Sequence, residues 1–172
     1  MSWIQTYTGK QFYPLTPSLE AIDVRDIAHS LSLQCRYNGH CRVFYSVADH
    51  SLRVSRIVPP EHALWGLLHD AAEAYLTDLP RPVKHAVDGY DRLEDSLLRV
   101  IAQRFDLGWP MPEAVRHADD VLLATEMRDL LGPPPAPWPL SASPRTETIV
   151  PLTAREAEQA FLARHRELCG SE

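Results

Sequence analysis

The sequence predicts an all-α protein that begins with a small β-hairpin. Two observations carry this prediction: from residue 23 onward apolar residues recur at helical spacing between capping residues, and strand-like segments are confined to residues 3–15. The chain has 172 residues, enough for one domain with a sizeable core. We expect a single domain over residues 1–172, with a helical core over about 23–131, a proline-rich loop over 132–151 and a last helix over about 153–169.

Local signals mark where each element begins and ends. Thr8-Gly9-Lys10 reads as the turn of the hairpin. Asp23, Ser46 and Thr153 are residues of the kind that cap helix N-termini, and Gly108 is of the kind that ends a helix. The expected helices cover about 23–35, 46–58, 61–76, 90–105, 112–131 and 153–169, with a turn over 78–84.

Composition excludes several classes of function. No apolar run approaches the roughly 18 residues of a membrane span, and the N-terminus lacks the pattern of a signal peptide. The sequence has three cysteines, Cys35, Cys41 and Cys169. Their odd number and the lack of a C-x-x-C pair argue against disulfides and cysteine zinc sites. The net charge of −6, without a basic block, argues against binding a nucleic acid polymer. We therefore expect a cytoplasmic protein with neither a membrane nor a nucleic acid as partner.

Four ionisable residues interrupt the apolar faces of three expected helices: His50, the adjacent pair His69 and Asp70, and Asp119. A lone histidine in such a stripe is usually a hydrogen-bonded core residue, but an aspartate is rarely buried without a partner or a metal. Two imidazoles and two carboxylates that point inward together suit zinc, manganese, iron or cobalt, with magnesium as a further candidate.

Neighbouring residues compete for two of these positions. Asp120 is the rival of Asp119 but falls about 100° away from the centre of the apolar stripe. His29 and His40 are rivals of His50, and neither has its setting within an apolar helix face. We therefore favour His50 and Asp119.

The order His50, His69-Asp70, Asp119 resembles the H…HD…D signature of the HD superfamily of metal-dependent phosphohydrolases. The local context of residues 46–51 and 69–84 is similar to the 5′-deoxynucleotidase branch of that superfamily, which is related to phage enzymes that degrade deoxyadenosine triphosphate. The resemblance covers about residues 25–130 and implies an HD-domain helical bundle. It also implies that a metal ion activates a water molecule.

The resemblance further assigns roles to residues around the signature. It implies that Glu73 and Asp78 are catalytic carboxylates that position the water and move its proton, and leaves open which takes the proton first. Without the resemblance, Asp78 could simply close a turn and Lys84 could be a surface lysine. The substrate-binding residues that it implies are Arg36, Tyr37, Asp78, Leu79, Pro80, Arg81 and Lys84.

The expected activity is removal of phosphate from 2′-deoxynucleotides, with monophosphates and triphosphates such as dATP both open. Two alternatives remain: a non-catalytic HD sensor of a nucleotide or metal, and an HD hydrolase of an alarmone or cyclic dinucleotide. Retention of Glu73 and Asp78 argues against the sensor. We also expect a homo-oligomer, because relatives of this fold assemble symmetrically and because Trp109, Trp138 and Phe161 lie outside the motif-bearing helices.

Overall fold

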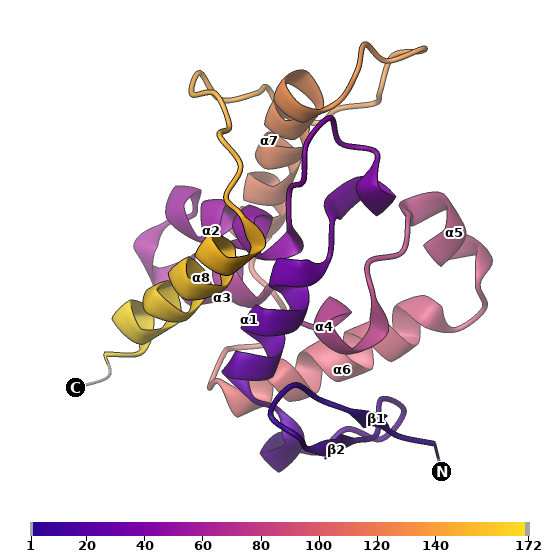
Figure 1. Cartoon of the computed structure of the whole chain (residues 1–172), viewed down its shortest axis with the longest axis vertical. Coiled ribbons are helices and arrows are strands. Elements are labelled where there is room, and N and C mark those ends of the chain that lie inside the picture. Colours follow the sequence, from indigo (N-terminus) through magenta and orange to yellow (C-terminus); the bar gives the residue numbers. More distant parts are fainter. Residues whose placement is uncertain (1, 171–172) are drawn as a thin grey trace.

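The computed structural model describes residues 2–170, and it confirms the predicted fold class: helices with one small antiparallel hairpin near the N-terminus (Figure 1). The η elements are short 3₁₀ helices. In chain order the elements are β1 (Ile4–Gln5), β2 (Gln11–Phe12), η1 (Leu19–Ala21), α1 (Val24–Leu33), η2 (Arg36–Gly39), α2 (Val47–Ile57), η3 (Pro60–His62), α3 (Ala63–Leu68), α4 (Glu73–Leu76), α5 (Arg81–Ala86), α6 (Tyr90–Arg104), α7 (Glu113–Leu130) and α8 (Ala154–Cys169).

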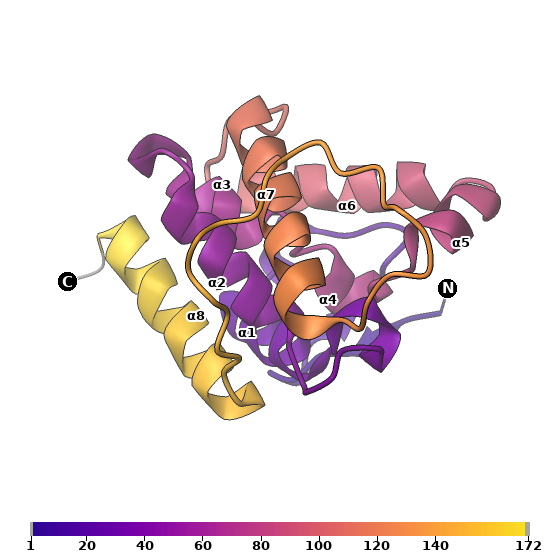
Figure 2. The ribbon, with the colours of Figure 1, turned by 90° about the horizontal axis from the view of Figure 1, so that it is seen from above.

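Helix α2 lies at the centre of the molecule. It contacts α1, α3, α7 and α8, and α8 packs along the flank that α1, α2 and α3 present (Figure 1 and Figure 2). Four polar side chains on α2 are buried as a result, Asp49, His50, Ser51 and Ser55, and a buried polar group needs a partner. The main core is filled by fully buried apolar side chains such as Leu31, Leu52, Leu67, Leu97 and Phe161.

The hairpin is present with shorter strands than the segments expected from the sequence. Pro14, which has no amide hydrogen, follows β2 closely and cannot extend the ladder. Asp26 on α1 holds the turn by accepting hydrogen bonds from the amide and hydroxyl of Thr8, at 2.6 and 2.9 Å. Phe12 is fully buried and stacks on Tyr75, with ring centroids 4.1 Å apart. In register, Ile4 pairs with Phe12 and Gln5 with Gln11.

The prediction of a single helix over 61–76 is wrong, because this part of the chain forms three shorter helices, η3, α3 and α4. Around the break, the amides of Ala71, Glu73 and Ala74 donate to carbonyls three residues back, not four. The His69 ring explains the break: its Nδ1 donates to the carbonyl of Gly66 at 2.9 Å, the acceptor that the amide of Asp70 would need to continue an α-helix.

The turn predicted over 78–84 is also corrected. The chain turns at Leu79 and Pro80 and then forms α5, which begins at Arg81. Pro82 occupies the first turn of this helix, where the missing amide hydrogen would have no partner in any case. From the sequence, Pro80 and Pro82 both indicated a turn, and the position of Pro82 in the first turn of a helix was not predicted.

The predicted helix caps are largely confirmed. Asp23, Ser46 and Thr153 each accept a hydrogen bond from an amide in the first turn of their helices. The end of α6 differs from the prediction. Asp106, with φ of 53°, takes the left-handed position after this helix, not Gly108.

Residues 131–153 contain no helix or strand, as predicted for the proline-rich loop. Figure 2 shows this loop in orange, leaving the end of α7 and returning across α7 to α8. Arg128 on α7 donates to the carbonyls of Arg145 and Glu147, and Asp129 accepts from the amide of Ile149 at 2.8 Å. The loop is therefore fastened to α7 along its returning half.

Two of the three apolar residues on which the oligomer prediction was based are packed within the fold. Phe161 is fully buried, and Trp109 is half-buried against Trp65, with ring centroids 6.1 Å apart. Trp138 remains 39% exposed. In residues 2–170, no helix combines the length and apolarity that crossing a membrane requires.

Candidate metal centre

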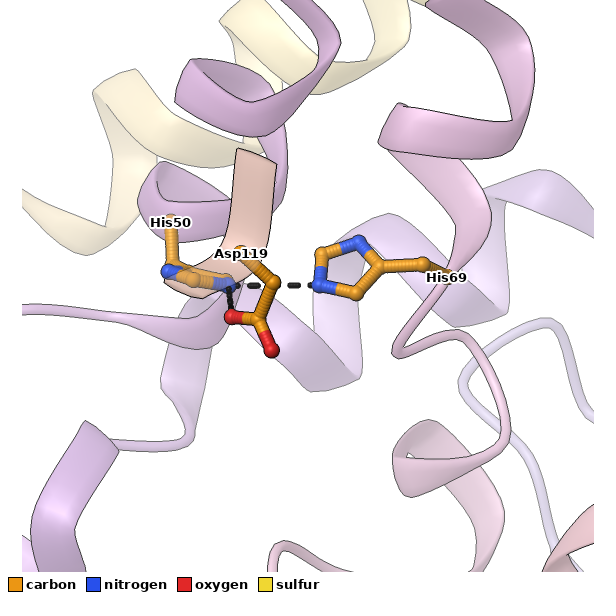
Figure 3. A group of neighbouring side chains, drawn as sticks. All are labelled: His50, His69 and Asp119. Atoms are coloured by element: carbon orange, nitrogen blue, oxygen red, sulfur yellow. Dashed lines mark hydrogen bonds and ion pairs between the residues drawn. The ribbon is translucent and has the colours of Figure 1, made fainter. Parts of the chain in front are cut away.

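Three helical segments bring His50, His69 and Asp119 together, from α2, the end of α3 and α7 (Figure 3). Their candidate ligand atoms all lie within 4.8 Å of one another. The Nε2 atom of His50 is 3.2 Å from Nε2 of His69 and 3.1 Å from Oδ1 of Asp119. Because one nitrogen or oxygen from each residue faces the same point, the group could hold a metal ion.

Asp70, the fourth ligand expected from the sequence, lies beside this group. Its Oδ2 atom is 3.3 Å from Nε2 of His69 and 3.7 Å from Nε2 of His50. The tight turn through residues 69–72 makes this possible, since it lets two consecutive side chains lean toward one side of the chain. All four residues predicted as ligands therefore lie in one cluster.

Hydrogen bonds at the far side of each imidazole decide which nitrogen faces the cluster. Nδ1 of His69 bonds to a carbonyl oxygen, which can only accept, so this nitrogen carries the hydrogen. Nδ1 of His50 lies 2.6 Å from Oε1 of Glu126, a carboxylate, which also accepts. In neutral rings the two Nε2 atoms therefore present lone pairs to each other, an arrangement that a cation stabilises.

Glu126 on α7 is a central residue of this site that the sequence reasoning missed. Its side chain is fully buried, and it accepts from the hydroxyls of Tyr37 and Tyr45, at 2.6 and 2.9 Å, as well as from His50. Burial alone would raise its pKa, but Arg36 and His50 lower it to about 2. A signal was present: Glu126 lies seven residues after Asp119, on the same face of α7 two turns along.

Charges around the cluster also favour a cation. The carboxylates of Asp70, Asp119 and Glu126 outnumber the guanidinium of Arg36, which lies 3.3 Å from Asp70 and 3.4 Å from Glu126. Burial and the charge of Arg36 oppose protonation of His50, yet Glu126 and Asp119 raise its pKa to about 9. The charges of the site therefore favour a cation, whether a proton or a metal ion.

Arg36 and Tyr37, expected to contact substrate, have their polar ends committed to this buried network. The side chain of Arg36 is 13% exposed, and both residues reach Glu126. Tyr37 and Asn38 have positive φ, and this turn of the chain directs Tyr37 back toward α7. Both residues still line the cavity described below.

Glu73 and Asp78, expected to be catalytic, lie next to the cluster. One oxygen of the buried Glu73, Oε2, has no hydrogen-bond partner among the described residues. Burial, with Asp70 and Asp78 nearby, raises the pKa of Glu73 well above its usual range, and burial also raises that of Asp78. Gln34 ties the two together, donating to the carbonyl of Glu73 at 3.1 Å and accepting from the amide of Asp78 at 3.2 Å.

A cavity of about 1070 Å³ opens beside Asp70, Asp119 and Glu73. Every residue that the sequence assigned to substrate lines it, from Arg36 and Tyr37 through the segment 78–81 to Lys84. Lys84 is ion-paired with Glu94. Arg81 makes no ion pair with another residue in the part of the chain that the structure describes. With a volume of about 1070 Å³, the cavity is large enough for a ligand of nucleotide size.

The rival residues lie elsewhere. Asp120 accepts from the hydroxyl of Ser141 at 2.6 Å and does not enter the cluster. His29 stacks on Tyr7 beside the hairpin. His40 lines the cavity without joining the ligand group.

Comparison with known proteins finds relatives of nearly the whole chain. YfdR of Escherichia coli (strain K12) is 41% identical over 171 residues, which cover 98% of this chain and 96% of YfdR. RCAP_rcc00048 of Rhodobacter capsulatus is 34% identical over 145 residues, covering 76% of this chain and 74% of that protein. Both relatives are described as uncharacterized proteins. No protein-family model matches the chain.

Proposed function

This chain belongs to the same family as YfdR of Escherichia coli, and we propose that it is an HD-type, metal-dependent phosphohydrolase that removes phosphate from 2′-deoxynucleotides. The observation that carries the proposal is the pair of facing Nε2 atoms of His50 and His69, 3.2 Å apart. They are flanked by Asp70 and Asp119, and these two carboxylates line the cavity. Glu73 and Asp78, lining the same cavity, supply the carboxyl groups that hydrolysis by water needs.

His50, His69, Asp70 and Asp119 would hold the metal ion. Two imidazole nitrogens with two carboxylates suit zinc, cobalt, manganese or iron better than magnesium, which prefers oxygen ligands. A bound ion of this kind polarises a phosphoryl oxygen and lowers the pKa of water toward about 7.

Glu73 has the environment of a proton carrier. Its raised pKa makes it hold a proton more readily than an exposed carboxyl group does, and its Oε2 atom has no hydrogen-bond partner among the described residues. Gln34 keeps the backbone of Glu73 and that of Asp78 in a fixed relation. Both residues line the same cavity.

The substrate proposal rests on the cavity and on the resemblance described above. Arg81, exposed and without an ion pair among the described residues, is available to a phosphate chain. A pocket closed around the sugar would leave a 2′-hydroxyl unpaired, at a cost of roughly 1–3 kcal/mol. We therefore propose deoxynucleoside monophosphates and triphosphates, such as dATP, as substrates.

The test is phosphate release from deoxy- and ribonucleotides of each base and phosphate length, with zinc, cobalt, manganese, iron or magnesium. We expect metal-dependent release with higher kcat/KM for the deoxy forms. His69→Ala should abolish it, whereas His117→Ala, an exposed histidine on α7, should not. Nucleotide binding without turnover under all metals would overturn the proposal in favour of a sensor.

Glu73 is tested by the substitution Glu73→Gln, which keeps the shape of the side chain and removes its proton chemistry. We expect metal content to stay and phosphate release to fall by about 10²- to 10⁴-fold. Glu61→Gln, at an exposed position in η3, is the matched control. Turnover near the unmodified level in metal-loaded Glu73→Gln would contradict the assigned role.

A further inference from the structure

We propose that Trp138, on the loop between α7 and α8, forms the wall of a base-binding subsite on which the heterocyclic base of a nucleotide stacks. This inference rests on the proposed function and deepens it. Trp138, Pro139 and Leu140 line the same cavity as Asp70 and Asp119. The indole of Trp138 remains 39% exposed, so one of its surfaces is open to a ligand.

The loop holds Trp138 close to the metal centre. The hydroxyl of Ser141 donates to Oδ2 of Asp120 at 2.6 Å, and Asp120 is the chain neighbour of Asp119. Farther along, the amide of Arg145 donates to Oγ1 of Thr125 on α7 at 3.0 Å. The segment that carries Trp138 is therefore fastened within three residues of its indole.

The composition of the loop also keeps Trp138 in place. Pro137 and Pro139 flank it directly, and three more prolines follow Gly132. Each proline fixes one backbone angle, so such a segment loses little freedom when it binds a ligand. An exposed tryptophan on a stiff, fastened segment is suited to stacking.

A cation and an exposed indole line the cavity from different elements. The cationic side chain of Arg81 on α5 suits a phosphate group, whereas Lys84 on the same helix is ion-paired with Glu94. Apolar side chains line the cavity from the middle of α7, with Leu123, and from the loop after α7, with Leu131 and Trp138, and Leu79, Pro80 and Pro82 line it beside α5. A ligand that carries phosphate on one side and an aromatic ring on the other fits this division.

Trp138 suits the base better than Tyr37 does, the aromatic residue among the substrate-binding residues expected from the sequence. The hydroxyl of Tyr37 is bonded to the buried Glu126, which fixes its ring. The two rings lie 6.5 Å apart between centroids and are tilted by 56°, so a base cannot lie flat between them. Stacking on the exposed indole, with Tyr37 at its edge, is the arrangement that the geometry permits.

The test compares a nucleotide with the same molecule lacking its base. For Trp138→Ala we expect the ratio of kcat/KM for a deoxynucleoside monophosphate to that for deoxyribose 5-phosphate to fall by roughly 5- to 100-fold, mainly through KM. Trp138→Phe should restore most of the ratio, because phenylalanine also stacks. An unchanged ratio in Trp138→Ala would overturn the proposal.

A binding measurement separates failure of this inference from failure of the proposed function. Deoxynucleosides, which carry no phosphate, should quench tryptophan fluorescence in the unmodified protein and less so in Trp138→Phe. Trp3→Phe, 49% exposed on the hairpin side and outside the cavity, is the matched control and should keep the quenching. Quenching without any hydrolysis would refute the phosphohydrolase and retain the base site. Equal quenching in Trp138→Phe would refute the base site alone.

Discussion

Glu126 shows how a single buried carboxylate can organise the candidate metal centre. It accepts hydrogen bonds from His50, Tyr37 and Tyr45 and pairs with Arg36, each from a segment distant from α7 in the chain. Its bond to Nδ1 of His50 sets which nitrogen of that ring faces the other ligands. Residues of this kind do not touch a metal but decide how well its ligands are directed.

Replacing Glu126 by glutamine should therefore weaken metal binding. The amide keeps the size of the side chain but has one acceptor oxygen and an NH₂ group that faces donors. We expect Glu126→Gln to lower metal affinity by about 10- to 100-fold, measured by competition with a chelator. Glu113→Gln, the same change at the exposed start of α7, should leave affinity unchanged. Equal affinities in the two variants would exclude the orienting role.

At the scale of elements, the close approach of α2 and α3 determines where His50 and His69 meet. Gly66 on α3 faces Ser55 on α2, and a Cβ atom at Gly66 would lie 2.9 Å from the Cα of Ser55. The contact is with backbone, which cannot move aside without shifting a helix. The same glycine supplies the carbonyl that holds the ring of His69.

Gly66→Ala should consequently destabilise the protein. Overpacking of this kind costs about 1–3 kcal/mol, which corresponds to a fall in Tm of about 2–10 °C for a chain of this size. Thermal unfolding followed by circular dichroism measures the change. Gly132→Ala, where an added Cβ meets nothing within 4 Å, provides the comparison and should stay near the unmodified Tm.

The fastening of the proline-rich loop to α7 predicts a pH-dependent contribution to stability. The hydrogen bond from Arg128 is the largest cause that lowers the pKa of Asp129 below 3.8, and Asp129 also accepts from Ile149. A carboxyl group whose pKa is lowered on folding stabilises the fold above 3.8, and this contribution is lost as the pH falls through its folded pKa.

Asp129→Asn should therefore lower Tm by about 2–6 °C at pH 7, since a charge-assisted hydrogen bond is lost. The difference from the unmodified protein should shrink steadily below pH 4. Thermal unfolding of both proteins between pH 7 and pH 2.5 measures it. A gap in Tm that is constant over this range would show that the charge of Asp129 does not contribute.

For the whole molecule, the candidate ligands join three helices around the centre of the fold. His50 comes from α2, His69 from the end of α3 and Asp119 from α7. A ligand that binds the folded chain and not the unfolded chain stabilises it by mass action. A metal ion held by these residues is therefore expected to stabilise the fold.

Removing the metal should lower Tm measurably. At a metal concentration of about 100 times Kd the stabilisation is about 2.7 kcal/mol, or roughly 5–10 °C for a domain of this size. The measurement compares chelator-treated protein with protein reloaded with zinc or manganese. In His69→Ala the two curves should nearly coincide, and a coincidence already in the unmodified protein would refute metal binding.

Elements that depend on neighbours in the chain could be predicted from the sequence. The caps at Asp23, Ser46 and Thr153 act on amides within one turn, and the stripes that contain His50 and Asp119 follow from helical periodicity alone. Those local rules sufficed for the fold class and for most helix boundaries. They also directed attention to the ligand cluster, since a polar residue within an apolar stripe is visible in the sequence.

Features that depend on contacts between residues far apart in the chain could not be predicted from the sequence by these local rules. Glu126 meets His50 across 76 positions, and the break after α3 follows from the His69 ring taking a carbonyl from the helix. Trp138 reaches the cavity because its loop is held on α7. Burial and partner geometry, not residue type, decide these roles, and both arise only when the helices pack together.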